Sequence, residues 1–98
     1  MFDKMKALFE MQKKMQQMKQ ELDNTIFEVV SSDGLVKITM NGAQQVKGVN
    51  IRGELGQTDK AALEKASTDA YNRAIKRAQE IAAGKMKDIS GIDLPGLA

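Results

Sequence analysis

The stretch from Asp33 to Ile51 constrains the fold of this chain more than any other part of the sequence. It begins with Asp33-Gly34 and has Asn41-Gly42 near its middle. Both dipeptides favour two-residue hairpin turns with positive φ angles, and apolar or β-branched residues alternate around them. Two such turns in succession predict three consecutive antiparallel strands.

Between the two turns, side chains alternate in character, as expected of a strand with one buried face. The apolar face holds Val36, Ile38 and Met40, and the other face holds Leu35, Lys37 and Thr39. After the second turn this period of two is interrupted, because Val46 and Val49 are three residues apart. We expect a β-bulge at Gly48, which would return Val46, Val49 and Ile51 to one face.

Residues 3–22 are predicted to form a long amphipathic helix. Its apolar residues follow 3-4-3-4 spacing and form one narrow stripe, made of Leu8, Met11, Met15, Met18 and Leu22. A helix of about 20 residues is about 30 Å long and these strands are about 20 Å long, so part of the helix must overhang the sheet. A second copy of the chain is the simplest partner for the overhang. The candidate contact residues are Phe2, Met5, Leu8, Phe9, Met11 and Met15.

The remaining sequence predicts one more strand and a second long helix. Residues 25–31 form the first strand of the meander, with apolar residues on both faces, which suggests burial on two sides. The second helix starts after an N-cap at Thr58 or Asp59 and ends near Gly84. Alanine recurs every fourth residue along this helix, which favours close packing within the chain and leaves a dimer contact as the alternative.

These elements predict an α+β protomer with the order α-β-β-β-α, folded as one domain over residues 1–98. Residues 1–24 form the amino-terminal helical arm, residues 25–53 the meander, residues 58–84 the second helix and residues 85–98 a tail. The sheet is expected to hold both helices on its apolar face.

The composition argues against an enzyme. The 98 residues include no Cys and no His, which removes thiol nucleophiles, the commonest proton shuttle and the commonest metal ligand. The carboxylates form no convergent pair, and no glycine-rich phosphate loop is present. We therefore expect no catalytic residues, no metal, no cofactor and no small-molecule substrate. No apolar run reaches the length of about 20 residues that a membrane span needs, so a cytoplasmic protein without a membrane partner is expected.

Basic residues on the two helices are candidates for contacts with DNA phosphates. They are Lys13, Lys14, Lys19, Arg73, Lys76, Arg77, Lys85 and Lys87. The alternative is an ordinary solvated surface, because Glu10 with Lys14, Asp69 with Arg73 and Lys76 with Glu80 are all i,i+4 pairs. A formal net charge of only +2 is a weak signal by itself. A two-fold homodimer would present each basic group twice.

The order and spacing of several motifs resemble one known family. They are the Met/Gln/Lys-rich first helix, the Gly34-x-Val36-x-Ile38-x-x-Asn41-Gly42-x-x-x-Val46-x-x-Val49-x-Ile51 pattern, Leu63-Glu64, Ala70-Tyr71-Asn72-Arg73-Ala74, and Gly91 followed by Leu94-Pro95-Gly96. Together they resemble the YbaB/EbfC family of bacterial nucleoid-associated proteins. The resemblance implies a tweezer-shaped homodimer whose protruding helices bind double-stranded DNA in the cytoplasm, at the nucleoid, without enzymatic activity.

Three positions depart from the pattern of that family. Ser32 stands where the family commonly has Gly, Arg52 where it often has Asp, and Lys65 where an acid often follows Leu-Glu. No DNA-reading residue of the family can therefore be assigned to a position here, and contacts to phosphate with little sequence readout are expected. The alternative function is a dimeric scaffold that grips another protein with the apolar tip of its first helix.

Overall fold

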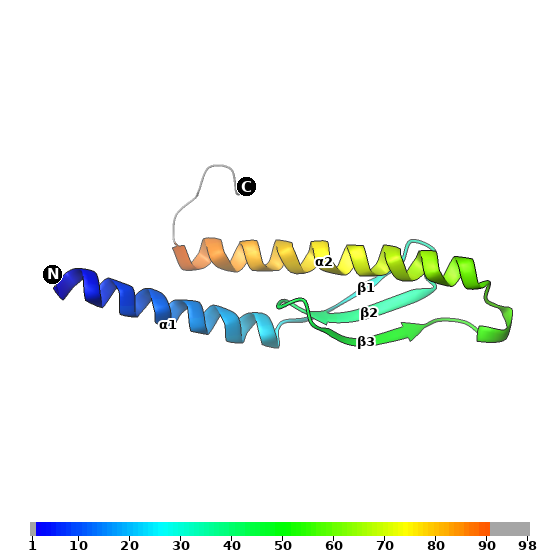
Figure 1. The fold of residues 1–98 in the computed structure, drawn as a ribbon, viewed down its shortest axis with the longest axis horizontal. Helices are drawn as coiled ribbons and strands as arrows, with labels where there is room; N and C mark the ends of the chain where they lie inside the picture. Colours follow the sequence, from blue (N-terminus) through cyan, green and yellow to red (C-terminus); the bar gives the residue numbers. More distant parts are fainter. Residues whose placement is uncertain (1, 91–98) are drawn as a thin grey trace.

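The computed structural model describes residues 2–90 of the chain. The elements are α1 (Phe2–Asn24), β1 (Ile26–Val30), β2 (Val36–Asn41), β3 (Val46–Ile51), a short 3-10 helix η1 (Leu55–Gln57) and α2 (Lys60–Ser90). This order confirms the predicted α-β-β-β-α protomer (Figure 1).

The three strands form one antiparallel sheet in the order β1-β2-β3, and α2 packs on one face of it. The buried face of β2 consists of Val36, Ile38 and Met40, as the alternation predicts. The helix contributes the alanines on its inner side, namely Ala66, Ala70, Ala74 and Ala78. These small side chains let the helix lie close to the strands, so the alanine repeat serves packing within the chain.

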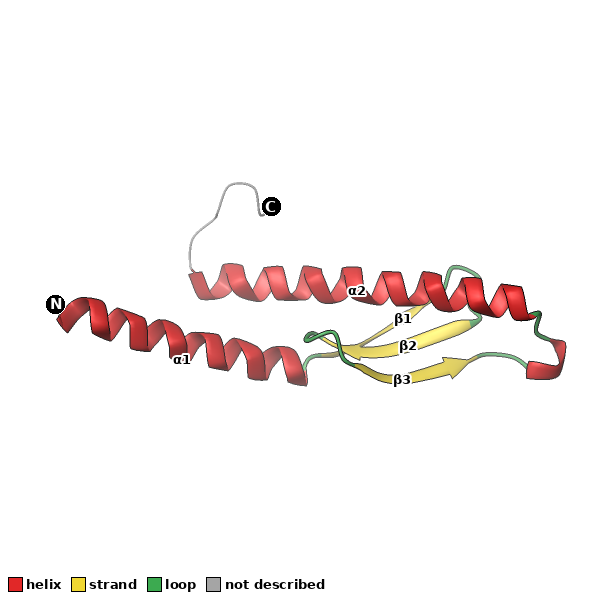
Figure 2. Cartoon of the chain, viewed as in Figure 1, coloured by secondary structure: helices red, strands yellow, loops and turns green. Residues whose placement is uncertain are grey.

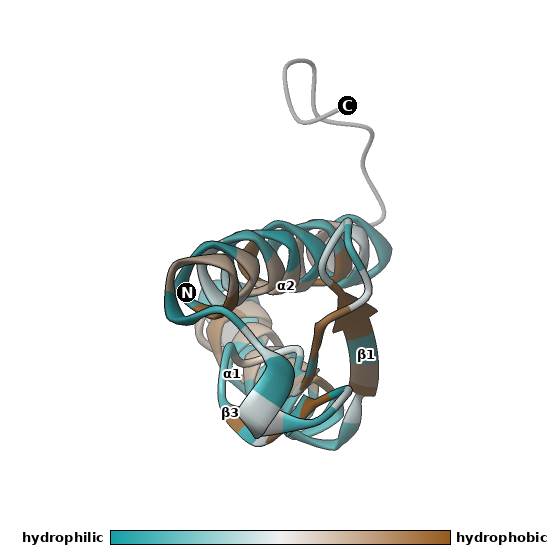
Figure 3. Cartoon of the chain, turned by 90° about the vertical axis from the view of Figure 1, so that its right-hand side faces the viewer, coloured by the Kyte–Doolittle hydropathy of each residue, from teal (hydrophilic) through white to brown (hydrophobic). Residues whose placement is uncertain are grey.

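The strand β1 is only partly buried. Phe27 and Val29 pack against the core, whereas Ile26 on the other face is 53% exposed. In the end-on view of Figure 3, α2 lies on one side of the sheet, and β1 is coloured mostly as hydrophobic. The expected burial of β1 on two sides does not occur within the described chain, because no element covers the second face.

The predicted bulge is present in β3. Thr39 faces Gly48 and Met40 faces Val46, so Lys47 is the extra residue beside Gly48. The bulge places the apolar residues of β3 on the same face of the sheet as the buried residues of β2, because Val49 pairs with Ile38 and Ile51 with Val36. The helix α2 covers this face over β1 and β2. These β3 side chains nevertheless remain exposed, since α2 packs on β2 and β1.

The two turns differ from the two-residue type that the dipeptides predict. In the first, the positive φ occurs at Gly34 alone, and the backbone N–H of Gly34 donates to the carbonyl of Ser31. In the second, the positive φ of 65° belongs to Gln44 and not to Gly42. Both loops are therefore longer, with a left-handed residue at the end of the turn.

Gly42 is needed for a close approach and not for its φ angle. Its N–H donates to the carbonyl of Leu22 over 2.9 Å, which brings the hairpin against the last turn of α1. The side chain of Asn41 is buried and joins the same contact, because its Nδ2 donates to the carbonyl of Asp23. These bonds fix the end of α1 to the β2–β3 hairpin.

The helix α1 is attached to the sheet only near its carboxyl end. Leu22 is buried, whereas the amino-terminal turns project past the sheet (Figure 2). The predicted overhang is therefore present, but the expectation that one face of the sheet holds both helices is wrong. Only α2 covers that face. The last turn of α1 contacts the hairpin that follows β2, and the rest of α1 points away from the sheet.

The helix α2 is longer than the glycine predicts. Its N-cap is Asp59, whose carboxylate accepts the N–H of Ala62 at 3.3 Å. The helix then passes through Gly84 and continues to Ser90. Residues 85–90, expected to belong to a tail, are helical, and the rest of that tail lies outside the described residues. Both long helices consequently extend beyond the sheet on the same side (Figure 2).

Candidate nucleic-acid interface

Three of the candidate basic residues lie on α1. Lys13, Lys14 and Lys19 are exposed, and none of them forms an ion pair with another residue in the range 2–90. The pair expected between Glu10 and Lys14 is thus not formed. Adjacent helical residues differ by about 100° in direction, so the three lysines point to different sides of α1. Their charges are available to an anionic partner, although one straight phosphate backbone cannot meet all three.

Three more basic residues line a groove between α2 and the edge of the sheet. Arg73, Lys76 and Arg77 lie there beside Val29 and Val30, around a volume of about 320 Å³. Together Arg73, Lys76 and Arg77 are called the flank group here. The cations stand over apolar strand residues at the open edge of β1, which leaves their polar ends accessible.

Two members of the flank group already have acidic partners. Arg73 pairs with Asp69 at 3.1 Å, as the sequence predicts, and Arg77 pairs with Glu80 at 3.7 Å. The predicted pair between Lys76 and Glu80 is therefore replaced, and Lys76 has no ion-pair partner among the described residues. Such exposed pairs are weak, so phosphate oxygens can compete for both arginines.

The last two candidates lie in the carboxyl-terminal turns of α2. Lys85 pairs with Glu21 of α1 at 3.3 Å and so links the two helices where they run side by side (Figure 1). Next to this pair, polar residues of α1 line a hollow of about 610 Å³ that includes Gln17, Gln20 and Asn24. Lys87 is exposed one half-turn further on. The structure thus gives Lys85 a role in holding the helices together.

The eight basic residues do not converge on one spot. The flank group lies beside β1, whereas the remaining five residues lie on α1 and in the carboxyl-terminal turns of α2. An elongated ligand could contact both regions, and a small one could not. This distribution favours a polymer over a compact anion.

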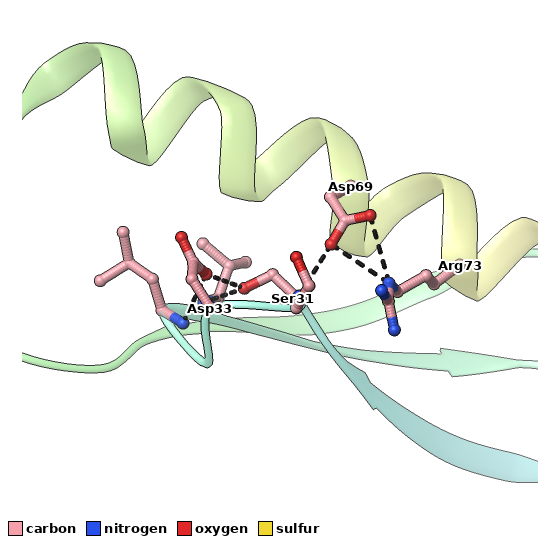
Figure 4. Close-up of polar contacts among 7 residues, drawn as sticks. Ser31, Asp33, Asp69 and Arg73 are labelled. Atoms are coloured by element: carbon pink, nitrogen blue, oxygen red, sulfur yellow. Dashed lines mark hydrogen bonds and ion pairs between the residues drawn. The ribbon is translucent and has the colours of Figure 1, made fainter.

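A polar network that the sequence did not reveal positions Arg73 (Figure 4). The backbone N–H of Ser32 donates to Asp69 Oδ2 over 2.8 Å, and Arg73 Nε donates to the same carboxylate. Asp69 therefore connects the β1–β2 loop to α2 and orients the guanidinium. The sequence indicates the pair of Asp69 with Arg73 but not the contact of Asp69 with Ser32, because Ser32 lies 37 residues away along the chain.

Asp33 plays a local role in the same loop. Its Oδ1 accepts the hydroxyl of Ser31 at 2.6 Å and the backbone N–H of Leu35 at 3.0 Å. These bonds, led by that of Ser31, hold the pKa of Asp33 below its usual value. The pKa of Asp69 is also lowered, first by the N–H of Ser32 and then by Arg73. Both carboxylates are consequently charged at neutral pH.

Replacing Asp69 with Asn is expected to reduce stability at neutral pH and not in acid. The pKa of Asp69 is lower in the folded chain than its ordinary value of 3.8, so its contribution is present above that value. The contribution disappears as the pH falls through the folded pKa, below 3.8. Urea unfolding of both proteins across this range measures the effect. A stability difference that stays constant into strong acid would contradict the role given to the charged carboxylate.

The apolar candidate residues of α1 are exposed. Leu8 and Phe9 are 65% and 66% exposed, and Met5, Met11 and Met15 are exposed as well. The side chain of Phe2 lies outside the described residues. Because α1 projects beyond the sheet, nothing in the described chain covers these side chains, which we call the α1 seam.

A second exposed apolar surface was not predicted. Val46, Val49 and Ile51 of β3 lie on the core side of the sheet, yet Val49 is 59% exposed. We call these three residues the β3 face. The alternation and the bulge place them on the inner side, but the course of α2 over the other two strands determines that they remain uncovered.

Two other kinds of site are absent from the described residues. No helix between residues 2 and 90 is both long and apolar enough to cross a membrane. Within the same range, no three His, Cys, Asp or Glu side chains come together as a metal site.

Comparison with known proteins identifies the family of this chain. Among solved structures, it is similar to an uncharacterized protein from Helicobacter pylori, with a TM-score of 0.78 and 23% sequence identity. That similarity covers 92% of this chain and 97% of the other, so the two share a fold. The sequence profile of the YbaB/EbfC DNA-binding family matches residues 1–92. The chain therefore belongs to the YbaB/EbfC DNA-binding family.

Proposed function

We propose that this chain is a homodimeric, nucleoid-associated protein that binds double-stranded DNA through the phosphate backbone, with little sequence readout. The observation that carries the proposal is a set of lysines on α1 without an ion-pair partner among residues 2–90, next to the projecting end of α2. A lysine binds a phosphate most readily when no carboxylate of its own protein competes for its charge. Lys13, Lys14 and Lys19 meet that condition among the described residues, and their binding would release counterions from the DNA. Membership of a DNA-binding family supports the same role and a location at the nucleoid in the cytoplasm.

The flank group extends the proposed interface along the molecule. Lys76 has no partner within residues 2–90, and the pairs of Arg73 and Arg77 are exposed. A DNA phosphate is an anion like the carboxylate that it would replace, and it can accept two hydrogen bonds from one guanidinium. Little sequence readout is proposed because contacts from lysine and arginine to phosphates fix a protein on the duplex and carry no sequence information.

The test is binding to two DNA duplexes of equal length and unrelated sequence, followed by fluorescence anisotropy at low salt. The proposal predicts similar dissociation constants for both duplexes, because the backbone is common to them. Strong preference for one duplex would remove the claim of little sequence readout. Absence of binding to either duplex at low salt would remove the function itself.

The homodimer is proposed from the two uncovered apolar surfaces, the α1 seam and the β3 face. Burying a large aliphatic side chain contributes about 1.5–3 kcal/mol, and each copy exposes several. In a two-fold dimer each surface appears twice, which makes the total gain large enough to offset the cost of association. A monomer would leave the inner side of its own edge strand open to solvent.

Replacing Val49 with Asp is expected to convert the dimer into a folded monomer. Val49 is 59% exposed in the protomer, so a carboxylate is tolerated there until a second copy covers it. Asn50 lies on the opposite face of the same strand, because it pairs with Lys37, and Asn50→Asp is the matched control. Sedimentation velocity measures the mass, and circular dichroism verifies the fold. A wild-type protein that sediments as a monomer, or a dimeric Val49→Asp variant, contradicts this interface.

A second candidate function is that of a protein-binding scaffold, favoured by the exposure of Leu8 and Phe9 at the projecting tip. The proposed phosphate contacts and the scaffold contact use different side chains. Leu8 and Phe9 also belong to the α1 seam proposed for the dimer, so substitution of the flank group is the change that separates the two functions. Neutralising the flank group should weaken DNA binding and leave a scaffold intact. Leu8→Gln with Phe9→Gln should abolish contact with a partner protein under the second function.

A further inference from the structure

The sulfur chemistry of this chain is confined to methionine. The sequence has seven methionines and no cysteine. Three of the methionines on α1 are well exposed, with Met5 at 57%, Met11 at 54% and Met15 at 41%, whereas Met40 is fully buried in the core. Exposure makes a thioether accessible to peroxide, so reactivity should differ sharply between α1 and the core.

The exposed thioethers lie on the α1 seam itself. Met11 and Met15 are four residues apart and therefore stack along one side of the helix, next to Leu8. Methionine fits an apolar contact as well as leucine does, but it alone becomes polar when it is oxidised. A sulfoxide needs a hydrogen-bond donor when it is buried, and an apolar contact supplies none.

We propose that Met5, Met11 and Met15 form a peroxide-sensitive modification site that regulates assembly of the dimer. This rests on the proposed homodimer, because the seam must be covered by the second copy for oxidation to matter. The thioether sulfur attacks one oxygen of hydrogen peroxide, the O–O bond breaks, and a sulfoxide S–O bond forms. The other oxygen leaves as water with both protons, so sulfur is oxidised by two electrons and peroxide is reduced by two.

Assembly and oxidation are coupled by mass action. The exposed fractions given above are those of a separated protomer, so peroxide reacts with the seam while the copies are apart. A sulfoxide on the seam then opposes reassociation, and the oxidised copy stays separate. Conversely, dimer formation protects the three methionines, so their oxidation slows as protein concentration rises. A thiol-dependent methionine sulfoxide reductase restores the thioether and with it the dimer.

The experiment uses the full chain, treated with hydrogen peroxide and examined by peptide mass spectrometry and sedimentation velocity. Oxidation of the seam is expected to raise the dimer dissociation constant by at least about tenfold, since a polar group is left without a partner. The variant Met5→Leu, Met11→Leu, Met15→Leu keeps the apolar seam at nearly constant volume and should remain dimeric in peroxide. Met86→Leu, which removes an exposed methionine of α2, is the matched control and should stay sensitive. Replacing the same three seam methionines with Gln should dissociate the dimer without peroxide.

Each outcome supports or overturns the inference. Dissociation that follows oxidation of the seam, spares the Leu variant and reverses with the reductase supports it. A dimer that persists after the seam is fully oxidised overturns it and leaves the homodimer intact. A Leu variant that dissociates in peroxide like the wild type also overturns it, since another residue then responds. An untreated wild-type monomer refutes the homodimer instead. Unchanged circular dichroism and an unoxidised Met40 show that the fold survives treatment.

Discussion

Replacing Lys13, Lys14 and Lys19 together with Gln is expected to weaken binding to duplex DNA by at least about tenfold at a salt concentration of about 50 mM. These lysines are exposed and unpaired within the described chain, so their loss removes phosphate contacts and leaves no acid unmatched. Because they point to different sides of α1, two contacts per copy and about four per dimer are expected. The dependence of log K on log salt should then become shallower by about 3 to 4.

The control for this variant removes the same charge elsewhere. Lys37, Lys47 and Lys60 lie on the sheet and at the first turn of α2, away from the projecting arms. Changing these three to Gln gives an identical net charge and should change the affinity much less. Equal losses in the two variants, measured by anisotropy, would mean that overall charge and not the position of the α1 lysines governs binding.

The flank group should contribute less than the α1 lysines. Two of its three members must first release Asp69 and Glu80, whereas the lysines of α1 release no acid. Neutralising Arg73, Lys76 and Arg77 is therefore expected to lower the affinity by a smaller factor. The comparison ranks the two regions of the interface.

Replacing Gly42 with Ala is expected to destabilise the fold by about 1–3 kcal/mol. A Cβ at this position would lie 2.8 Å from Leu22 Cδ2, 3.1 Å from the carbonyl oxygen of Leu22 and 3.2 Å from its Cα. The side chain can rotate away, but the backbone of Leu22 cannot, since its carbonyl accepts the N–H of Gly42. The strain would separate α1 from the hairpin.

Urea unfolding measures this effect, and Gly48→Ala is the matched control. A Cβ at Gly48 meets nothing within 4 Å, so this second substitution should cost much less. Equal destabilisation by both substitutions would show that loss of glycine flexibility, and not the contact with Leu22, is responsible. A Gly42→Ala protein as stable as the wild type would contradict the close contact between Gly42 and Leu22.

The sequence was sufficient to predict features that follow from local periodicity. The alternation from Val36 to Met40 identified the buried face of β2, and the three-residue step before Val49 identified the bulge. In both cases the side-chain direction is set by neighbouring residues in the same strand. The order of helices and strands followed from the same patterns.

Features that depend on distant residues were predicted less well. Gly42 resembles a turn glycine in sequence, but a glycine is required there because Leu22 leaves no room for a Cβ atom. The residue with the positive φ angle in this turn is Gln44. Gly84 resembles a helix end, but the helix passes through it to Ser90. A glycine only lowers helix propensity by about 1 kcal/mol, which the favourable residues around it can offset.

For the candidate interface, too, local features could be predicted from the sequence and long-range contacts could not. Basic positions on exposed helical surfaces could be listed from sequence, whereas their partners could not, as the contact of Lys85 with Glu21 across 64 residues shows. The β3 face was also missed, because exposure there depends on which strands α2 crosses. Position in three dimensions decides which charges and which apolar side chains remain for a partner.

The salt dependence of wild-type binding to duplex DNA tests the proposed mode of binding most directly. Titrations between about 50 mM and about 200 mM salt should give a log–log slope steeper than about −3, because phosphate contacts release bound counterions. A slope near zero, or no binding at the lowest salt concentration, would contradict a dimer that holds the phosphate backbone through its lysines and arginines.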